Sequence, residues 1–104
     1  MKVSACEKGK QLILSLAGEI DHHCAAAFMA DIEEQIESAM PRDCVLDMEG
    51  VTFMDSSGIA VILKAYRRMR EIDGRLWVEN VRPQPLRVLD ASGIDRLVAV
   101  TAQM

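Results

Sequence analysis

The feature that most constrains this chain is the alternation of two hydrophobic patterns along its length. Short apolar runs, such as residues 44–48 and 76–80, alternate with longer stretches in which apolar residues recur at helical spacing. Alternation of this kind favours one sheet of mostly parallel strands joined by right-handed helical crossovers. With 104 residues the chain has the common size of one domain. We therefore predict a single α/β domain spanning residues 1–104.

The predicted order is strand, strand, helix, strand, helix, strand, helix, strand. Residues 3–6 and 11–18 flank a turn in which Gly9 can adopt positive φ, so the chain opens with a hairpin whose second strand ends at Gly18. A first helix then runs from an N-cap at Asp21 to Pro41, and a strand follows at residues 44–48. A loop from Gly50 to Asp55 leads to a second helix, which runs from Gly58 to a left-handed cap at Gly74. The chain continues with a strand at residues 76–80, a short helix from Pro83 to Gly93 and a last strand at residues 97–101. This is a mixed, mostly parallel sheet with helices packed against it.

Composition excludes several classes of function. Half of the residues are apolar and 4% are aromatic, which predicts an ordered core of mainly aliphatic side chains. A net charge of −4 opposes nucleic-acid binding, which needs clustered Lys and Arg. No apolar run approaches the roughly 20 residues of a membrane span. Three cysteines with no C-x-x-C spacing, in a chain with no signal-peptide pattern, fit a reducing cytosol, so we expect a cytoplasmic protein without membrane or nucleic-acid contact.

Two loops at the predicted carboxyl ends of strands carry polar residues. Residues 18–24 and 53–58 each run from a strand into a helix, and in open α/β sheets such loops form the binding rim. Ser56 lies in the second loop at a helix start, where free backbone N–H groups and the helix dipole favour a phosphate. In the alternative interpretation, Ser56 and Ser57 only cap the helix while Asp55 shapes the turn. Taken alone, the tetrapeptide DSSG at residues 55–58 favours that alternative.

Three segments change this balance because they resemble one family in order and spacing. They are GEIDHH at residues 18–23, VTFMDSSGIAVILKAYRRM at residues 51–69 and RPQPLRVLDASGI at residues 82–94. Together they resemble the STAS domain family of anti-sigma factor antagonists over nearly the whole chain. Within that family, the paired histidines of the first segment are most similar to antagonists of the anti-sigma-F factor, which help to release a sigma factor during endospore formation.

The resemblance implies a phosphorylation switch. In that family the partner is an ATP-binding anti-sigma factor that is also a serine kinase, and it modifies the first serine of the DSSG motif, here Ser56. The unmodified form displaces the sigma factor, the phosphorylated form is released, and a PP2C-type serine phosphatase resets it. The antagonist supplies a substrate hydroxyl, so we expect no enzymatic activity, no cofactor and no metal. The expected partner-binding residues are Asp21, His22, Asp55, Ser57, Gly58 and Ile59.

Two departures from the family pattern also bear on binding. Ala60 replaces a glycine that is common after the DSSG motif, which narrows the approach of a partner backbone to the second helix. Many relatives carry a further C-terminal helix over the sheet, whereas this sequence ends at Met104 soon after the last predicted strand. We therefore expect some sheet surface to be exposed or covered by a partner.

Other interpretations stay open at this stage. The HHC run at residues 22–24 suggests a metal site, but adjacent side chains rarely converge on one ion. A serine hydrolase needs a G-x-S-x-G elbow and an acidic relay for its histidine, neither of which the sequence indicates. The cluster of Arg67, Arg68 and Arg70 is typical of a solvated helix face, although it also suits an acidic partner. STAS domains also serve stress-signalling complexes and lipid or anion transport as interaction modules, and fold alone does not separate these functions.

Overall fold

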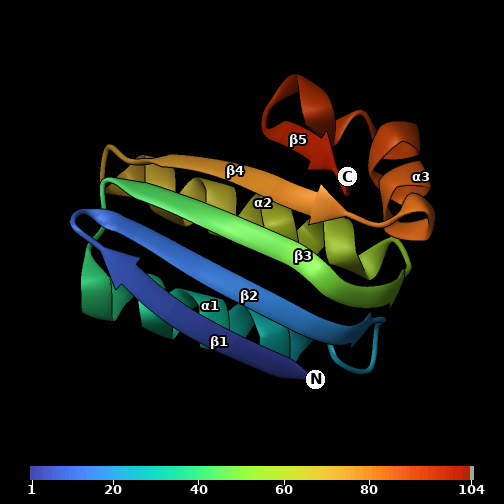
Figure 1. Ribbon diagram of the computed structural model, residues 1–104, viewed down its shortest axis with the longest axis horizontal. Coiled ribbons are helices and arrows are strands. Elements are labelled where there is room, and N and C mark those ends of the chain that lie inside the picture. The colour runs from blue at the N-terminus through green and yellow to red at the C-terminus, as the bar shows by residue number, and fades with distance from the viewer. Residues whose placement is uncertain (104) are drawn as a thin grey trace.

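The sheet has five strands, which are β1 Lys2–Lys8, β2 Gln11–Ile20, β3 Asp43–Met54, β4 Arg75–Val81 and β5 Ala99–Ala102. They lie in the order β1-β2-β3-β4-β5, so neighbours in the sheet are also neighbours in the chain (Figure 1). β1 pairs antiparallel with β2, and each later pair is parallel. These positions come from a computed structural model that describes residues 1–103. The predicted mixed, mostly parallel sheet with an N-terminal hairpin is confirmed.

Three α-helices complete the fold, namely α1 Ala25–Ala39, α2 Ser57–Glu71 and α3 Pro83–Ser92. A short 3-10 helix, η1 Ile94–Arg96, joins α3 to β5. Helices α1 and α2 lie along one face of the sheet, whereas α3 lies near the carboxyl end of β4 (Figure 1). The opposite face, toward the viewer in Figure 1, has no helix of residues 1–103 over it. The two loops that the sequence singles out join β2 to α1 and β3 to α2.

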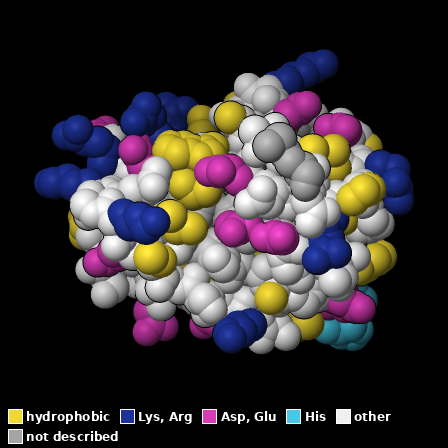
Figure 2. Space-filling model, in the orientation of Figure 1, with side chains coloured by type: hydrophobic (Ala, Val, Ile, Leu, Met, Phe, Trp, Pro, Cys, Tyr) yellow, Lys and Arg dark blue, Asp and Glu magenta, His cyan; other side chains and the backbone are white. Residues whose placement is uncertain are grey.

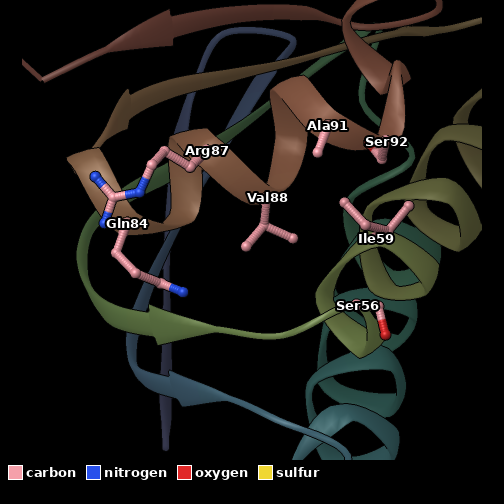
Figure 3. A pocket seen from close by; sticks show the side chains of 7 residues that line it. All are labelled: Ser56, Ile59, Gln84, Arg87, Val88, Ala91 and Ser92. Carbon is pink, nitrogen blue, oxygen red and sulfur yellow. The ribbon is translucent and has the colours of Figure 1, made fainter.

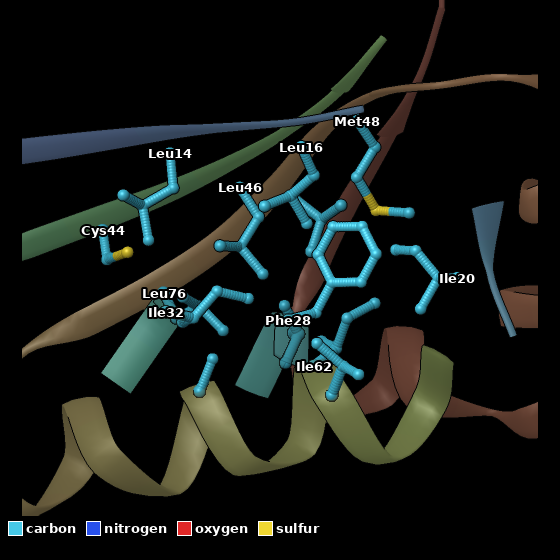
Figure 4. Packing of buried hydrophobic residues seen from close by; sticks show 14 of the residues in the cluster. Leu14, Leu16, Ile20, Phe28, Ile32, Cys44, Leu46, Met48, Ile62 and Leu76 are labelled. Carbon is cyan, nitrogen blue, oxygen red and sulfur yellow. The ribbon is translucent and has the colours of Figure 1, made fainter. Parts of the chain in front are cut away.

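The core lies between the sheet and helices α1 and α2 (Figure 4). On β2 the strand alternation turns Leu12, Leu14 and Leu16 toward the helices, and each is at most 1% exposed. On α1, Phe28 and Ile32 recur one turn apart and are fully buried. Burying one such side chain contributes roughly 1.5–3 kcal/mol to folding. The ordered, mainly aliphatic core predicted from composition is confirmed.

Two strands are longer than the sequence predicts, and a glycine explains each case. β2 continues past Gly18 to Ile20, so the prediction that Gly18 ends the strand is wrong. Gly18 has φ 107°, and the register with β3 shifts just after it, so the strand bulges and then continues. β3 likewise runs through Gly50 to Met54, where the sequence predicts a loop. A Cβ on Gly50 would lie 2.8 Å from the Cβ of Ala17, so the glycine permits close pairing of the two strands.

Two predicted helix boundaries are also wrong in detail. The carboxylate of Asp21 accepts hydrogen bonds from the N–H groups of residues 23–24, both at 3.0 Å, so it organises a turn and α1 begins only after that turn. After α2 the left-handed residue is Asp73, with φ 57°, and not Gly74. Gly74 is favoured for another reason, because a Cβ there would lie 2.9 Å from the backbone oxygen of Arg42 and 2.5 Å from the Cε of Met69. Its N–H donates to the carbonyl of Met69 at 2.8 Å and closes the helix.

Candidate functional site

The two loops that the sequence singles out meet at the carboxyl ends of β2 and β3. The last paired residues of these strands are Ile20 and Met54, and the N–H of Asp55 donates to the carbonyl of Ile20 at 3.2 Å. The backbone N–H of His22 donates to Oδ2 of Asp55 at 3.3 Å. The imidazole Nδ1 of His22 lies 3.9 Å from the same oxygen. The predicted convergence of the two loops is confirmed.

Asp55 ties both loops to the start of α2. Its Oδ1 accepts a hydrogen bond from the backbone N–H of Ser57 at 2.8 Å, while its Oδ2 accepts the one from His22. A carboxylate in this position satisfies a free N–H of the first helical turn and lies at the positive end of the helix dipole. The side chain is 32% exposed, so it is held by contacts and still reached by water. Asp55 is therefore the side chain that caps α2.

Ser56 occupies the N-cap position of α2, but its hydroxyl makes no capping hydrogen bond. Its backbone is already helical, with φ −62° and ψ −18°, whereas a capping serine usually has an extended backbone. The residue is exposed, and Figure 3 shows its hydroxyl directed away from the neighbouring groove. The interpretation in which Ser56 only caps the helix is therefore wrong. The same interpretation is right that Asp55 shapes the turn. The hydroxyl is free for a visiting active site.

The next three residues hold the start of α2 against the sheet. Ser57 and Ile59 are half-buried, and Gly58 is buried. A Cβ on Gly58 would lie 2.3 Å from both Cγ and Sδ of Met54, which leaves no room for any larger residue unless the methionine moves. The glycine thus has a packing role at this position. Partner contacts by these three residues stay a prediction.

The first loop is organised around Asp21. Partial desolvation would raise the pKa of Asp21, but the hydrogen bonds from Cys24 and His23 outweigh it and hold that pKa below its ordinary value. Desolvation raises the pKa of the Cys24 thiol, and its hydrogen bond to Asp21 raises it further. His22 projects from this loop with a side chain that is 71% exposed. The loop therefore presents an accessible imidazole on a turn fixed by a carboxylate.

The paired histidines of this loop lie against each other. Their ring centroids are 3.9 Å apart, with 39° between the ring planes. Within residues 1–103, no group of three or more His, Cys, Asp and Glu side chains is placed to hold a metal ion.

None of the helices in this part of the chain combines the length and the apolar character needed to span a bilayer.

An apolar groove begins beside Ser56 and runs between α2 and α3 (Figure 3). It has a volume of about 510 Å³ and is lined by Ser56, Ile59, Gln84, Arg87, Val88, Ala91 and Ser92. Gln84 positions α3 here, because its Oε1 accepts from the N–H of Met54 at 2.9 Å and its Nε2 donates to the carbonyl of Met54 at 3.0 Å. Sequence reasoning missed this groove, since its walls are separated in the chain by β4 and no local pattern marks Gln84.

Comparison with known proteins agrees with this architecture. The model of the STAS domain family matches residues 2–103. An anti-sigma F factor antagonist of Paenibacillus polymyxa is 35% identical over 89 residues, which cover 86% of this chain and 76% of that protein. The solved structure of the anti-sigma factor antagonist SpoIIAA in its unphosphorylated form is similar with a TM-score of 0.79 and 25% identity, covering 95% of this chain and 87% of that one. The phosphorylated form of the Bacillus protein SpoIIAA is similar with a TM-score of 0.70 and 25% identity, over 95% and 90% of the two chains. The resemblance in the sequence, the sheet topology and the family match thus agree, and the chain belongs to the STAS domain family.

Proposed function

We propose that this protein is an anti-sigma factor antagonist whose binding is controlled by phosphorylation of Ser56. The unmodified form binds an anti-sigma factor that is also a serine kinase, and the sigma factor is released. Phosphorylation of Ser56 by that kinase ends the interaction, and a PP2C-type phosphatase restores the hydroxyl. The observation that carries this proposal is the exposed Ser56 hydroxyl, which makes no capping contact at the start of α2.

The relatives support both parts of the proposal. The Paenibacillus polymyxa protein is named for antagonism of an anti-sigma F factor. SpoIIAA, which has the same fold, is an anti-sigma factor antagonist that has an unphosphorylated and a phosphorylated form. On this basis we propose that the kinase partner is of the anti-sigma-F type and that the protein acts in the control of sporulation.

The free protein can carry a phosphate on Ser56. The modification adds about −1.5 to −2 charges, and the exposed position leaves the group hydrated. The positive end of the α2 dipole lies beside it and favours an anion. The neighbouring carboxylate of Asp55 repels the phosphate, but it is held by Ser57 and His22, so the loops need not rearrange.

The same phosphate opposes docking of a partner over Ser56. Two unit charges 4 Å apart interact by about 1 kcal/mol in water and about 4 kcal/mol at the lower effective dielectric constant near a protein surface. When a partner covers the loops, the repulsion between the phosphate and Asp55 rises by roughly that difference of about 3 kcal/mol. This change weakens binding on the order of 100-fold. The surface expected to bind is formed by Asp21, His22, Asp55, Ser57, Gly58 and Ile59.

The test is phosphorylation of the protein by an anti-sigma-F kinase. Incubation with the kinase, ATP and Mg²⁺, followed by mass spectrometry of proteolytic peptides, should place one phosphate on Ser56. Ser57→Ala is the matched control for the site and should still accept one phosphate on Ser56, whereas Ser56→Ala should stay unmodified. A phosphate found only on Ser57 would refute the site assignment. A wild-type protein that binds the kinase but is never modified would refute the switch.

A further inference from the structure

A second groove lies at the opposite end of α2 from Ser56. It has a volume of about 430 Å³ and is lined by Tyr66, Arg70, Gly74, Arg75, Leu76, Trp77, Leu97 and Ala99. We call it the α2–β4 groove. Because a helix rises 1.5 Å per residue, Arg70 lies about 20 Å along α2 from Ser56. A partner can therefore occupy this groove without touching the loop that carries Ser56.

The α2–β4 groove offers an apolar surface that the chain leaves uncovered. Leu97 is 57% exposed, and Trp77 is half-buried. The indole Nε1 of Trp77 donates to Oε2 of Glu79 at 2.8 Å, which fixes the ring and satisfies its polar group. The first residue of β4 that pairs with β5 is Trp77, opposite Ala99, so the start of β4 has no strand beside it on that side. The groove thus has a fixed aromatic wall next to an open stretch of strand.

Two arginines lie at the rim of this groove, and only one of them lacks a carboxylate partner within residues 1–103. Arg70 stacks on Tyr66, with its Cζ 5.8 Å from the ring centroid, and its Nη1 donates to the tyrosine hydroxyl at 3.2 Å. Within residues 1–103, Arg70 has no carboxylate at ion-pair distance, so its charge is oriented but not neutralised. Arg75 uses Nε and Nη2 to bind Asp43 and is 72% exposed. Figure 2 shows Lys and Arg side chains, together with Asp and Glu side chains, around a hydrophobic patch at this end of the molecule.

The neighbouring Arg68 shows why Arg70 is distinctive. Arg68 lies 3.2 Å from Oε1 of Glu37 and 3.7 Å from Oε2 of Glu71, so it joins α1 to α2 and is already paired. The expectation that the arginine cluster forms a solvated helix face therefore fits the exposed Arg67 and Arg70 but not Arg68, whose side chain is 28% exposed and pairs within the chain. Arg70 differs from Arg67 because its guanidinium is held against an aromatic ring in the lining of the groove.

We propose that the α2–β4 groove binds an acidic segment of a protein partner that carries an aliphatic or aromatic side chain. The apolar side chain packs between Trp77 and Leu97, and a flanking carboxylate accepts hydrogen bonds from the Arg70 guanidinium N–H groups that do not donate to Tyr66. Charge complementarity selects the acidic partner, and Trp, Tyr and Arg are the residue types that contribute most to protein interfaces. A nucleic acid fits less well, because the chain carries a net charge of −4 and the groove supplies only two cations.

The experiment uses the fluorescence of Trp77, the one tryptophan in the sequence. The probe is a peptide of sequence EDELFDED, titrated at low salt, with ¹⁵N chemical shifts recorded in parallel. Saturable changes in Trp77 emission, with shifts confined to the groove residues, are expected. The neutral peptide QNQLFNQN and the peptide EDESSDED, which lacks the apolar anchor, should each bind more weakly. Phosphorylation of Ser56 should leave the affinity for the probe unchanged, so this test and that of the proposed function fail separately.

Variants locate the interaction. Arg70→Gln should weaken binding of EDELFDED by about tenfold, as loss of a charged hydrogen bond does, and Leu97→Ser should weaken it as well. Arg67→Gln, on the same helix but outside the groove lining, should bind like the wild type. Equal affinity for the acidic and neutral peptides, unchanged Trp77 emission, or shifts centred on Ser56 would overturn the proposal. A single-stranded oligonucleotide that bound the same residues more tightly than the peptide would overturn the choice of a protein partner.

Discussion

Replacement of Asp55 by alanine tests whether this carboxylate, and not the Ser56 hydroxyl, caps α2. The change removes the hydrogen bond from Ser57 N–H at 2.8 Å and the longer one from His22 N–H at 3.3 Å. Loss of a helix cap costs about 1 kcal/mol, and loss of the longer, exposed bond adds about 0.5 kcal/mol. We expect the free energy of unfolding to fall by about 1.5 kcal/mol, which for a chain of this size lowers Tm by roughly 6–12 °C.

Two further variants control for this result in urea and thermal unfolding. Asp55→Asn keeps an acceptor for Ser57 N–H but loses the charge beside the helix dipole, so it should cost about half as much as Asp55→Ala. Ser56→Ala should change the free energy of unfolding by less than about 0.5 kcal/mol, because the hydroxyl is exposed and makes no capping bond. Equal destabilisation by Ser56→Ala and Asp55→Ala would refute the reasoning, since the hydroxyl would then contribute to the cap.

Three other predictions follow from single contacts or burial. Ser56→Asp should weaken binding to the ADP-loaded kinase in calorimetry while Ser56→Ala binds like the wild type, and equal affinities would count against a charge-based switch. Gly58→Ala should lower the free energy of unfolding by about 1–3 kcal/mol, because its Cβ would lie 2.3 Å from Sδ of Met54, and Met54→Ala should offset part of this loss in a double-mutant cycle. Burial raises the pKa of the Cys44 thiol from 9.0 to about 12, so a thiol reagent at mildly alkaline pH should modify exposed Cys6 in the native protein and Cys44 only after unfolding. Because the unfolded thiol ionises first, the free energy of unfolding should also fall as pH rises from 9.0 to about 12, which pH-dependent urea titration would detect.

The order of elements was predictable because it depends on local hydrophobic periodicity. The stripe on α2 and the alternation on β2 each bury one face of one element, and a single sequence shows such patterns directly. The ends of β2 and β3 were not predictable. Gly18 and Gly50 are breakers in most contexts, and only pairing between the two strands turns them into a bulge and a close approach.

The candidate site divides in the same way. The DSSG motif and its place at a helix start could be located from residues 55–58 alone. The sequence could not show which side chain caps the helix, because Asp and Ser are both good N-caps. The pairing of Ile20 with Met54 decides it, since it sets where β3 ends and turns Asp55 toward Ser57 N–H and His22 N–H.

By itself, then, the sequence determined the alternation of strands and helices, the aliphatic core, the family resemblance and the position of Ser56 before α2. Only the tertiary structure decided that Asp55 binds both loops, that Ser56 keeps a free hydroxyl, and that Trp77 and Arg70 share a groove. The physical reason is the separation in the chain over which each effect acts. Periodicity and helix propensity act between residues a few positions apart, whereas a groove or a bridging carboxylate depends on groups that the sheet brings together from distant parts of the chain.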